Sequence, residues 1–315
     1  MRENNHWDLI GDIHGYADEL ILMLAQLGYQ KHKESYAHPQ GRKVIYLGDY
    51  IDKGPKIRES LKIVRGMVDA GNALAIMGNH EYNALAYHTA DNQGGWLRSH
   101  NKDHHAQHAN TIEQIVDPHP EEWREWMNWF STLPLFLDLG NLRVAHAGWD
   151  TKLTGHLKEI HRLDEPTLKE MNRRDSLLNE AKQVFLNGPE LRLPKGHEIE
   201  DHAGVKRNTM RCRWWSSMKG KSYREAIFPS SEDAPDLLIP DQALEGLFAY
   251  SEEEVPLFFG HYALPPNTTP EPLQRNVACL DYSIAHHGGL TAYRWDGEGE
   301  LTQDKFVVIT KPINL

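Results

Sequence analysis

The stretch GDYIDKGP, residues 48–55, follows directly on the hydrophobic run VIYL at 44–47. A short apolar run is typical of a buried strand, and the Gly, Asp and Pro residues that come next are typical of a turn. The carboxylates of Asp49 and Asp52 and the ammonium of Lys53 therefore lie just beyond the end of an expected strand. We ask whether other expected strands end in the same way.

Two further units with the order strand, turn, helix surround this stretch. The expected strands are 7–12, 43–49 and 72–80, and the expected helices are 17–28, 57–71 and a third that begins at 81. Such a succession predicts parallel strands joined by helices. In parallel sheets, ligands bind beyond the carboxyl ends of the strands. The segments 142–150 and 255–264 predict two further strands that also end in polar residues.

The five strand ends carry side chains suited to metal ions. They are Asp12, His14, Asp49, Asn79, His146 and His261. Carboxylate, amide and imidazole groups without thiolates favour Mn²⁺, with Fe, Zn²⁺ or Co²⁺ as alternatives. Six groups exceed the needs of one tetrahedral ion, so they predict two divalent metal ions, roughly 3.5–4 Å apart, that share a bridging carboxylate.

Five motifs in this order resemble the calcineurin-like metallophosphoesterases of the phosphoprotein phosphatase type, which include Ser/Thr protein phosphatases and symmetrical diadenosine tetraphosphatases. The motifs are GDIHG (11–15), GDYIDKGP (48–55), GNHE (78–81), AHAG (145–148) and GH (260–261). The resemblance covers residues 7–150 and about 255–310. It implies hydrolysis by direct attack of metal-bound hydroxide, without a phosphoenzyme.

The resemblance also implies individual roles. Asp12 and His14 would hold the first ion, Asp49 would bridge both, and the second would be completed by Asn79, His146 and His261. His80 would protonate the leaving group, and a neighbouring carboxylate, Asp52, would keep its imidazole cationic.

The expected phosphate-binding residues are Lys53, Arg211 and Arg213. Lys53 stands where the family usually has Arg, and a lysine cannot reproduce the bidentate contact of a guanidinium group. Arg211 and Arg213 are alternate residues of NTMRCRWW (208–215), so both would face one side of an extended segment. The pattern does not decide between them.

We expect an α/β fold with two β-sheets packed face to face, flanked by helices, in a single domain, 1–315. Residues 151–254 predict a mostly helical cap within it, and the carboxyl end predicts a β-meander. Residues 121–137 predict a buried amphipathic helix. The His-rich segment 100–108 is interpreted as a polar surface insertion, with a further metal site as the alternative. His286 and His287 lie just past an expected strand near the site, and neither is assigned to it.

Composition limits the remaining possibilities. The 315 residues carry a formal charge of −11, which argues against nucleic-acid binding, and the two cysteines, Cys212 and Cys279, give no metal clip and indicate a reducing compartment. The sequence shows no pattern typical of a signal peptide or of a membrane span, so we predict a cytoplasmic protein. The sequence indicates no oligomeric state.

Two substrate classes fit these expectations. The GNHE motif favours hydrolysis of phosphate monoesters, including phosphoprotein, and this class is placed first. AHAG and the Arg-x-Arg stretch favour dinucleoside polyphosphates. A non-catalytic metal-binding scaffold is the third alternative, and it would predict missing ligands, whereas every expected ligand is present.

Overall fold

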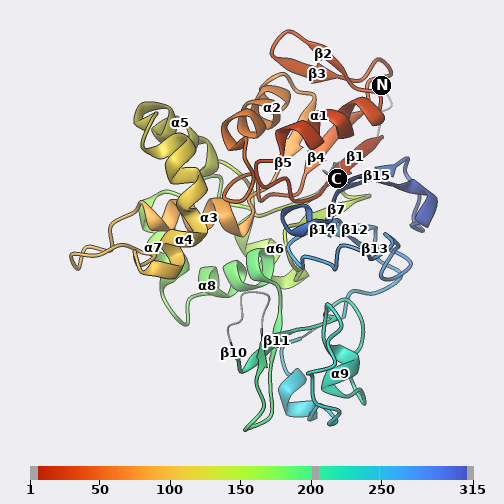
Figure 1. Cartoon of the computed structure of the whole chain (residues 1–315). Helices are drawn as coiled ribbons and strands as arrows, with labels where there is room; N and C mark the ends of the chain where they lie inside the picture. Colours follow the sequence, from red (N-terminus) through yellow and green to blue (C-terminus); the bar gives the residue numbers. More distant parts are fainter. Residues whose placement is uncertain (1–5, 201–205, 248, 311–315) are drawn as a thin grey trace.

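The first β-sheet carries the three expected parallel strands. In this computed structural model, which describes residues 6–200, 206–247 and 249–310, β1 (Trp7–Ile10), β4 (Lys43–Tyr46) and β5 (Ala73–Ala75) run parallel. Three strands from the carboxyl end complete the sheet: β15 (Gly289–Trp295) pairs antiparallel with β1, β14 (Asp281–Tyr282) and β16 (Phe306–Thr310) (Figure 1). A separate hairpin joins β2 (Gln30–His32) to β3 (Ser35–Ala37).

The second sheet has the strand order β13-β12-β7-β6. Its strands are β6 (Phe136–Asp138), β7 (Arg143–Ala145), β12 (Leu257–Phe259) and β13 (Val277–Cys279). β12 runs parallel to both β7 and β13. The expected carboxyl-terminal meander therefore divides, because β13 belongs to the second sheet and β14 to the first. Only Leu280 separates these two strands.

Alternation along the strands places one hydrophobic layer between the two sheets. Leu9 and Ile45 of the first sheet share a buried cluster with Val144 and Phe258 of the second. Ile10 points to the other face of the first sheet, where α1 (Ala17–Gln26) and α2 (Ile57–Asp69) pack. The expected sandwich of two sheets flanked by helices is confirmed.

Helices α3 (Asn79–Tyr87), α4 (Lys102–Thr111) and α5 (Pro120–Phe130) follow β5, and a π-helical turn (Ile112–Val116) continues α4. Trp123, Trp126 and Phe130 of α5 are buried, as expected for an amphipathic helix. The interpretation of 100–108 as a surface insertion is wrong for its last residue: His108 is only 4% exposed. Its helix packs this side chain inward, whereas the neighbouring His105 is exposed.

The segment 151–254 is helical only in its first part. Helices α6 (Thr151–Leu157), α7 (Glu165–Asn172) and α8 (Leu177–Lys182) lead into a π-helical turn (Gln183–Asn187). Gly188, with φ of +77°, and Pro189 then end the helical region. The expectation of a mostly helical segment is therefore wrong for the described residues after 187.

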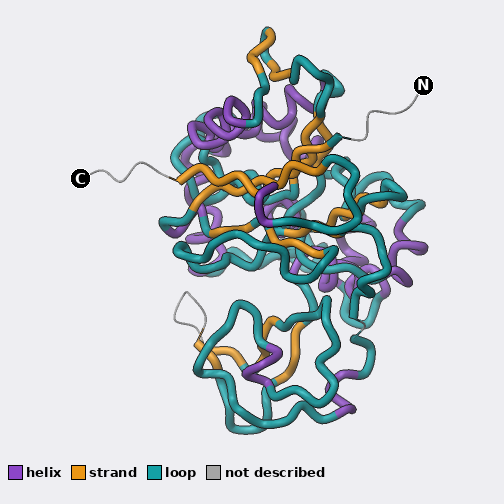
Figure 2. Tube along the Cα trace, turned by 90° about the vertical axis from the view of Figure 1, so that its right-hand side faces the viewer, coloured by secondary structure: helices purple, strands orange, loops and turns teal. Residues whose placement is uncertain are grey.

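Short strands and turns make up the rest of that segment. β8 (Glu190–Arg192) pairs with β11 (Thr209–Arg211), β9 (Ile199–Glu200) pairs with β10 (Lys206–Arg207), and α9 (Tyr223–Ala226) and a 3₁₀ turn (Asp241–Leu244) follow. This part forms a lobe beside the sandwich (Figures 1 and 2). The rings of Trp215 and Phe228 join it to Phe259 and Tyr262 at the end of β12.

Both cysteines, Cys212 and Cys279, are free and buried. In the described part of the chain, no helix combines the length and the apolar character that crossing a membrane requires.

Candidate metal centre

The polar strand ends of both sheets meet at one cavity of about 180 Å³. Its lining contains five of the six expected metal ligands: Asp12, His14, Asp49, Asn79 and His261. The sixth, His146, is fully buried and adjoins Asp49. Parallel strands bring these residues together because their carboxyl ends lie at the same edge of each sheet.

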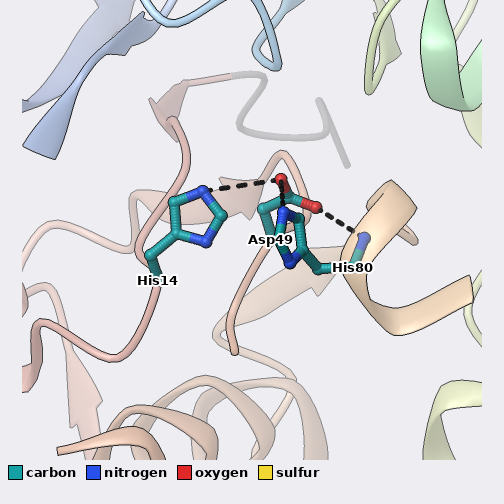
Figure 3. Close-up of side chains that lie close together, drawn as sticks. All are labelled: His14, Asp49 and His80. Carbon is teal, nitrogen blue, oxygen red and sulfur yellow. Dashed lines mark hydrogen bonds and ion pairs between the residues drawn. The ribbon is translucent and has the colours of Figure 1, made fainter. Parts of the chain in front are cut away.

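Asp49 lies between imidazoles from the two sheets. Its Oδ2 atom is 3.6 Å from Nε2 of His14, and its Oδ1 atom is 3.4 Å from Nε2 of His146. These separations are too long for hydrogen bonds. They are close to the separation of two ligands of one ion, since bonds of about 2.1 Å place neighbouring ligand atoms roughly 3.0–3.4 Å apart. Figure 3 shows the His14 side of this arrangement, together with His80.

Asn79 lies between the imidazoles of His146 and His261. Its Oδ1 atom lies 2.9 Å from Nε2 of His146 and 2.8 Å from Nδ1 of His261. One ligand atom from each of Asp49, His146 and His261 also lies within 4.8 Å of the other two. The second set of expected ligands therefore converges.

Backbone carbonyl groups orient two of the imidazoles. Nδ1 of His14 is 2.9 Å from the carbonyl oxygen of Ile51, and Nδ1 of His146 is 2.8 Å from that of Leu47. Each Nδ1–H donates to its carbonyl, which turns Nε2 toward Asp49. Outer hydrogen bonds of this kind are usual for histidines that bind metal ions.

Asp12 is fixed by backbone groups at the end of β12. Its carboxylate accepts a hydrogen bond from the backbone N–H of His261 at 3.1 Å. It does not belong to either compact group that contains Asp49, although it lines the same cavity. Its place is thus beside the backbone of His261.

Four residues of the site have backbone conformations that L-amino acids rarely adopt. The φ angles are +50° for His14, +55° for Asp49, +86° for Asp52 and +69° for His261. Such conformations cost about 1–3 kcal/mol each and concentrate at functional sites. Here three of these residues, His14, Asp49 and His261, line the cavity, and Asp52 contacts His80.

The electrostatics of the cavity favour a bound cation. Burial, followed by the charges of Asp281 and Asp49, raises the pKa of Asp12 well above its usual value. Burial lowers the pKa of His14 to about 4, so its imidazole is neutral at pH 7. Divalent ions would neutralise the crowded carboxylates and coordinate the neutral imidazole. The donor set therefore fits divalent metal ions.

His80 points into the cavity from α3 and is held by Asp52. Its Nδ1–H donates to Oδ2 of Asp52 at 2.6 Å, and its Nε2 atom is 3.8 Å from Oδ2 of Asp49. Burial lowers the pKa of His80, but the charge of Asp49 and the hydrogen bond that His80 donates to Asp52 outweigh it and raise the pKa above its ordinary value. This pair has the arrangement expected of a general acid and its supporting carboxylate.

Glu81 supports the site in a way that the sequence did not reveal. Its carboxylate accepts hydrogen bonds from the backbone N–H groups of Asp49 at 2.9 Å, Tyr50 at 2.8 Å and Gly78 at 3.0 Å. Burial, followed by the charge of Asp49, raises its pKa to about 7. The motif GNHE contains this residue, but only the fold shows that it ties two strand ends together.

The structure separates the two candidate arginines. Lys53 and Arg211 line the cavity, whereas Arg213 is not among the lining residues. Arg213 donates to Oγ of Ser230 at 3.1 Å and lies over the ring of Phe228. The expectation that both arginines share one face is wrong, because β11 ends at Arg211.

Asp281 and His286 are further lining residues that the sequence did not assign to the site. The carboxylate of Asp281 accepts hydrogen bonds from the backbone N–H groups of Ala263 at 2.6 Å and Ser283 at 3.0 Å. It therefore shapes the loops at the cavity edge. Asp281 lies inside the expected carboxyl-terminal meander, so no signal in the sequence pointed to its place at the cavity.

Two mixed sheets flanked by helices, with this cluster of Asp, Asn and His at their strand ends, define a metallophosphoesterase fold and site. Comparison with known protein families identifies the family to which the chain belongs. The chain belongs to the calcineurin-like phosphoesterase family, whose model matches residues 8–265.

Named relatives include tetraphosphatases. The chain is 25% identical over 313 residues to a symmetrical bis(5'-nucleosyl)-tetraphosphatase of Hamiltonella defensa, covering 91% of this chain and 93% of the relative. It is 33% identical over 144 residues to the asymmetrical bis(5'-nucleosyl)-tetraphosphatase PrpE of Bacillus subtilis, covering 45% of this chain. The chain spans only 57% of the length of that relative. It spans 30% of the PrpE of Halalkalibacterium halodurans, at 42% identity over 74 residues.

Among solved structures, a Saccharomyces cerevisiae Ser/Thr phosphatase similar to human PP5 has the same fold. The TM-score is 0.51 at 15% identity, and the match covers 98% of this chain and 80% of the other.

Proposed function

We propose that this protein is a metal-dependent hydrolase of phosphoric esters that uses two divalent ions. The observation that carries the proposal is the position of Asp49 between His14 and His146, at 3.6 Å and 3.4 Å. A carboxylate flanked in this way can contribute one oxygen to each of two ions. Mn²⁺ is the first candidate, because the donors are oxygen and nitrogen atoms without thiolates.

The assignment of ligands keeps the roles that the family resemblance implies; one compact group contains His14 and Asp49, the other contains Asp49, His146 and His261, and Asp12 and Asn79 line the same cavity. Asp12 and His14 would hold the first ion, Asn79, His146 and His261 the second, and Asp49 both. When bound, such ions supply positive charge that offsets the phosphoryl oxygens and lowers the pKa of water. His14 and His146 direct Nε2 inward because their outer nitrogens donate to carbonyl groups.

The remaining lining residues would bind and protonate the substrate. Lys53 and Arg211 bring positive charge to the cavity, which suits the non-bridging oxygens of a phosphoryl group. His80 directs Nε2 toward the same space while Asp52 holds Nδ1. It would donate a proton to the departing oxygen, and direct displacement by water requires no residue to become phosphorylated.

Dinucleoside polyphosphates are the substrate class that we place first. The tetraphosphatase of Hamiltonella defensa aligns with nearly the whole chain, including the cap segment that should contact the substrate. This alignment reverses the order expected from the sequence motifs, which placed phosphate monoesters first. At 25% identity it supports the class of substrate and leaves the individual nucleotide open.

Phosphate monoesters, including phosphoprotein, are the second candidate. The cavity of about 180 Å³ is smaller than a typical ligand pocket of about 300–1,000 Å³. It has room for one phosphoryl group, so the rest of a substrate must lie outside it. A cavity of this size contacts the phosphoryl group alone, so it also suits substrates that contain no nucleotide.

Product analysis distinguishes these substrates. The purified protein is incubated with Mn²⁺ and diadenosine tetraphosphate, and with phosphopeptides in parallel. ADP as the single nucleotide product supports symmetrical tetraphosphate cleavage, and ATP with AMP supports asymmetrical cleavage. Phosphate released only from phosphopeptides supports the second candidate. If no phosphoric ester is hydrolysed with any of Mn²⁺, Fe²⁺, Zn²⁺ or Co²⁺, the proposed enzyme function is wrong.

A further inference from the structure

Asp52 accepts hydrogen bonds on both sides of its carboxylate. Oδ2 accepts from Nδ1 of His80 at 2.6 Å. Oδ1 accepts from Nδ1 of His108 at 2.7 Å and from Oγ1 of Thr111 at 2.6 Å. The side chain of Asp52 is only 3% exposed, so these protein groups replace water as its partners.

The contacts on Oδ1 come from one face of α4. His108 and Thr111 are three residues apart, so both side chains lie on the same side of the helix. Thr111 also accepts a hydrogen bond from the backbone N–H of Asp52 at 3.1 Å. Both the backbone and the carboxylate of Asp52 are therefore attached to α4, while His80 belongs to α3.

The far side of His108 is equally well fixed. Its Nε2 atom lies 3.3 Å from Nε2 of His88, so one of the two nitrogens donates to the other. Both rings pack against Trp123 of α5, with centroids 5.3 Å away for His88 and 5.7 Å for His108. A continuous series of contacts thus leads from the cavity through His80, Asp52 and His108 to a packed aromatic wall.

We propose that His108 is a positioning residue for the reaction: by holding Oδ1 of Asp52, it fixes the carboxylate whose Oδ2 orients the imidazole of His80 toward the leaving group. This inference rests on the proposed function, in which His80 is the general acid. It assigns a role to the histidine-rich segment that sequence reasoning left as a surface insertion.

The hydrogen bonds on Oδ1 explain how His108 can position the carboxylate of Asp52. A carboxylate held by His80 alone could rotate about its Cβ–Cγ bond and would let the imidazole turn with it. The two additional donors on Oδ1 remove that freedom. Small misplacements of a reacting group can cost as much as about 100-fold in rate, so loss of the support should be visible in catalysis.

The decisive variants are His108→Ala and His108→Asn. An asparagine can place an amide N–H where the imidazole Nδ1–H lies, so it keeps the donor to Oδ1 and loses the contacts of the ring with His88 and Trp123. His105→Ala is the matched control, because His105 lies exposed on the same helix and contacts the hydroxyl of Tyr87 instead.

The first readout is proton transfer to the leaving group. With saturating Mn²⁺, His108→Ala should lower kcat by about tenfold or more for phenyl phosphate and by less than about threefold for p-nitrophenyl phosphate, whose leaving group needs no proton. His108→Asn and His105→Ala should stay within about threefold of the unmodified protein on both substrates.

The second readout does not depend on activity. In metal-free protein labelled with ¹⁵N-histidine, the Nδ1–H resonance of His80 is identified by its disappearance in His80→Asn. His108→Ala should shift or broaden this resonance, whereas His108→Asn should retain it.

An unchanged His80 resonance in His108→Ala would overturn the proposal. Equal losses on both substrates in His108→Ala and His108→Asn would also overturn it, since they would indicate a purely structural role. If the unmodified protein hydrolyses no phosphate ester, the proposed function fails, and the resonance comparison still decides whether His108 positions His80.

Discussion

The backbone of Gly260 lies against the carboxylate of Asp12: a β-carbon on Gly260 would stand 2.0 Å from Oδ1 of Asp12. The next residue, His261, donates its backbone N–H to the same carboxylate at 3.1 Å. The end of β12 therefore supplies a proposed ligand to the second ion and also fixes a proposed ligand to the first.

Gly260→Ala should displace Asp12 and weaken metal binding. The added methyl group cannot be accommodated without moving the carboxylate, because real β-carbons do not approach other atoms within 3.0 Å. We expect the affinity for the weaker Mn²⁺ ion to fall by about tenfold or more, as seen when groups that orient metal ligands are lost. Isothermal titration calorimetry measures this change.

Gly155→Ala is the control for this variant. Its β-carbon would meet no atom within 4 Å, so metal binding should be unchanged. Equal Mn²⁺ affinities for Gly260→Ala and the unmodified protein would show that the position of Asp12 does not matter for metal binding.

His80→Asn should affect substrates according to their leaving groups. Removal of a general acid typically costs about 10²–10⁴-fold when the departing oxygen needs a proton. We therefore expect a large loss of kcat for phenyl phosphate and a much smaller one for p-nitrophenyl phosphate, measured with saturating Mn²⁺.

The metal content of His80→Asn provides the control. Nε2 of His80 lies 3.8 Å from Asp49, and His80, His14 and Asp49 form one of the two compact groups that could hold a metal ion. The general-acid assignment requires that the variant bind as many ions as the unmodified protein. Loss of one ion per chain would instead identify His80 as a ligand.

Arg211→Met should impair substrate binding, whereas Arg213→Met should not. Arg211 lines the cavity, and Arg213 contacts Ser230 away from it. A hydrogen bond to a charged group contributes about 1.5–3 kcal/mol, so kcat/KM should fall by roughly 10- to 150-fold for Arg211→Met. Steady-state kinetics on one substrate for both variants check this; a larger loss in Arg213→Met would contradict the assignment.

His88 should make the stability of the protein depend on pH. Burial, followed by the charge of His108, lowers the pKa of His88 from 6.5 to about 4. Between these pH values the unfolded chain binds a proton that the folded chain does not. The contribution of neutral His88 to the free energy of unfolding is therefore fully present above about pH 6.5 and is lost as the pH falls toward 4. It amounts to at most about 3 kcal/mol.

His88→Gln isolates this effect, since glutamine can still contact His108 but cannot titrate. Urea unfolding of metal-free protein at pH 7 and pH 5 should show a smaller loss of stability for His88→Gln than for the unmodified protein. His105→Gln, at an exposed position, serves as the control. Identical losses in all three proteins would rule out this role of His88.

The sequence predicted the parts of the fold that depend on local periodicity. Asp12, Asp49 and Asn79 follow the strands of three repeated strand-turn-helix units. Because the carboxyl ends of parallel strands meet at one edge of the sheet, these polar residues predicted the position of the site. The expectation of a mostly helical segment at 151–254 was wrong for the described residues after 187, because Gly188 and Pro189 end the helical region.

Contacts between distant elements were not predictable in this way. The hydrogen bond from His108 to Asp52 depends on how α4 packs against the loop after β4. The place of Asp281 in the lining of the cavity depends on the passage of the chain at Leu280 from β13 in the second sheet to β14 in the first. No spacing within α4 or β14 encodes these contacts. The separation of Arg211 from Arg213 likewise follows from where β11 ends.

The most direct test of the central claim is the number and coupling of bound ions. Purified protein loaded with Mn²⁺ should contain two ions per chain by elemental analysis, and electron paramagnetic resonance should show that the two are magnetically coupled. Asp49→Ala, which removes the proposed bridge, should abolish the coupling and weaken both sites. A single ion per chain, or two uncoupled ions that are unaffected by Asp49→Ala, would contradict a shared dinuclear centre.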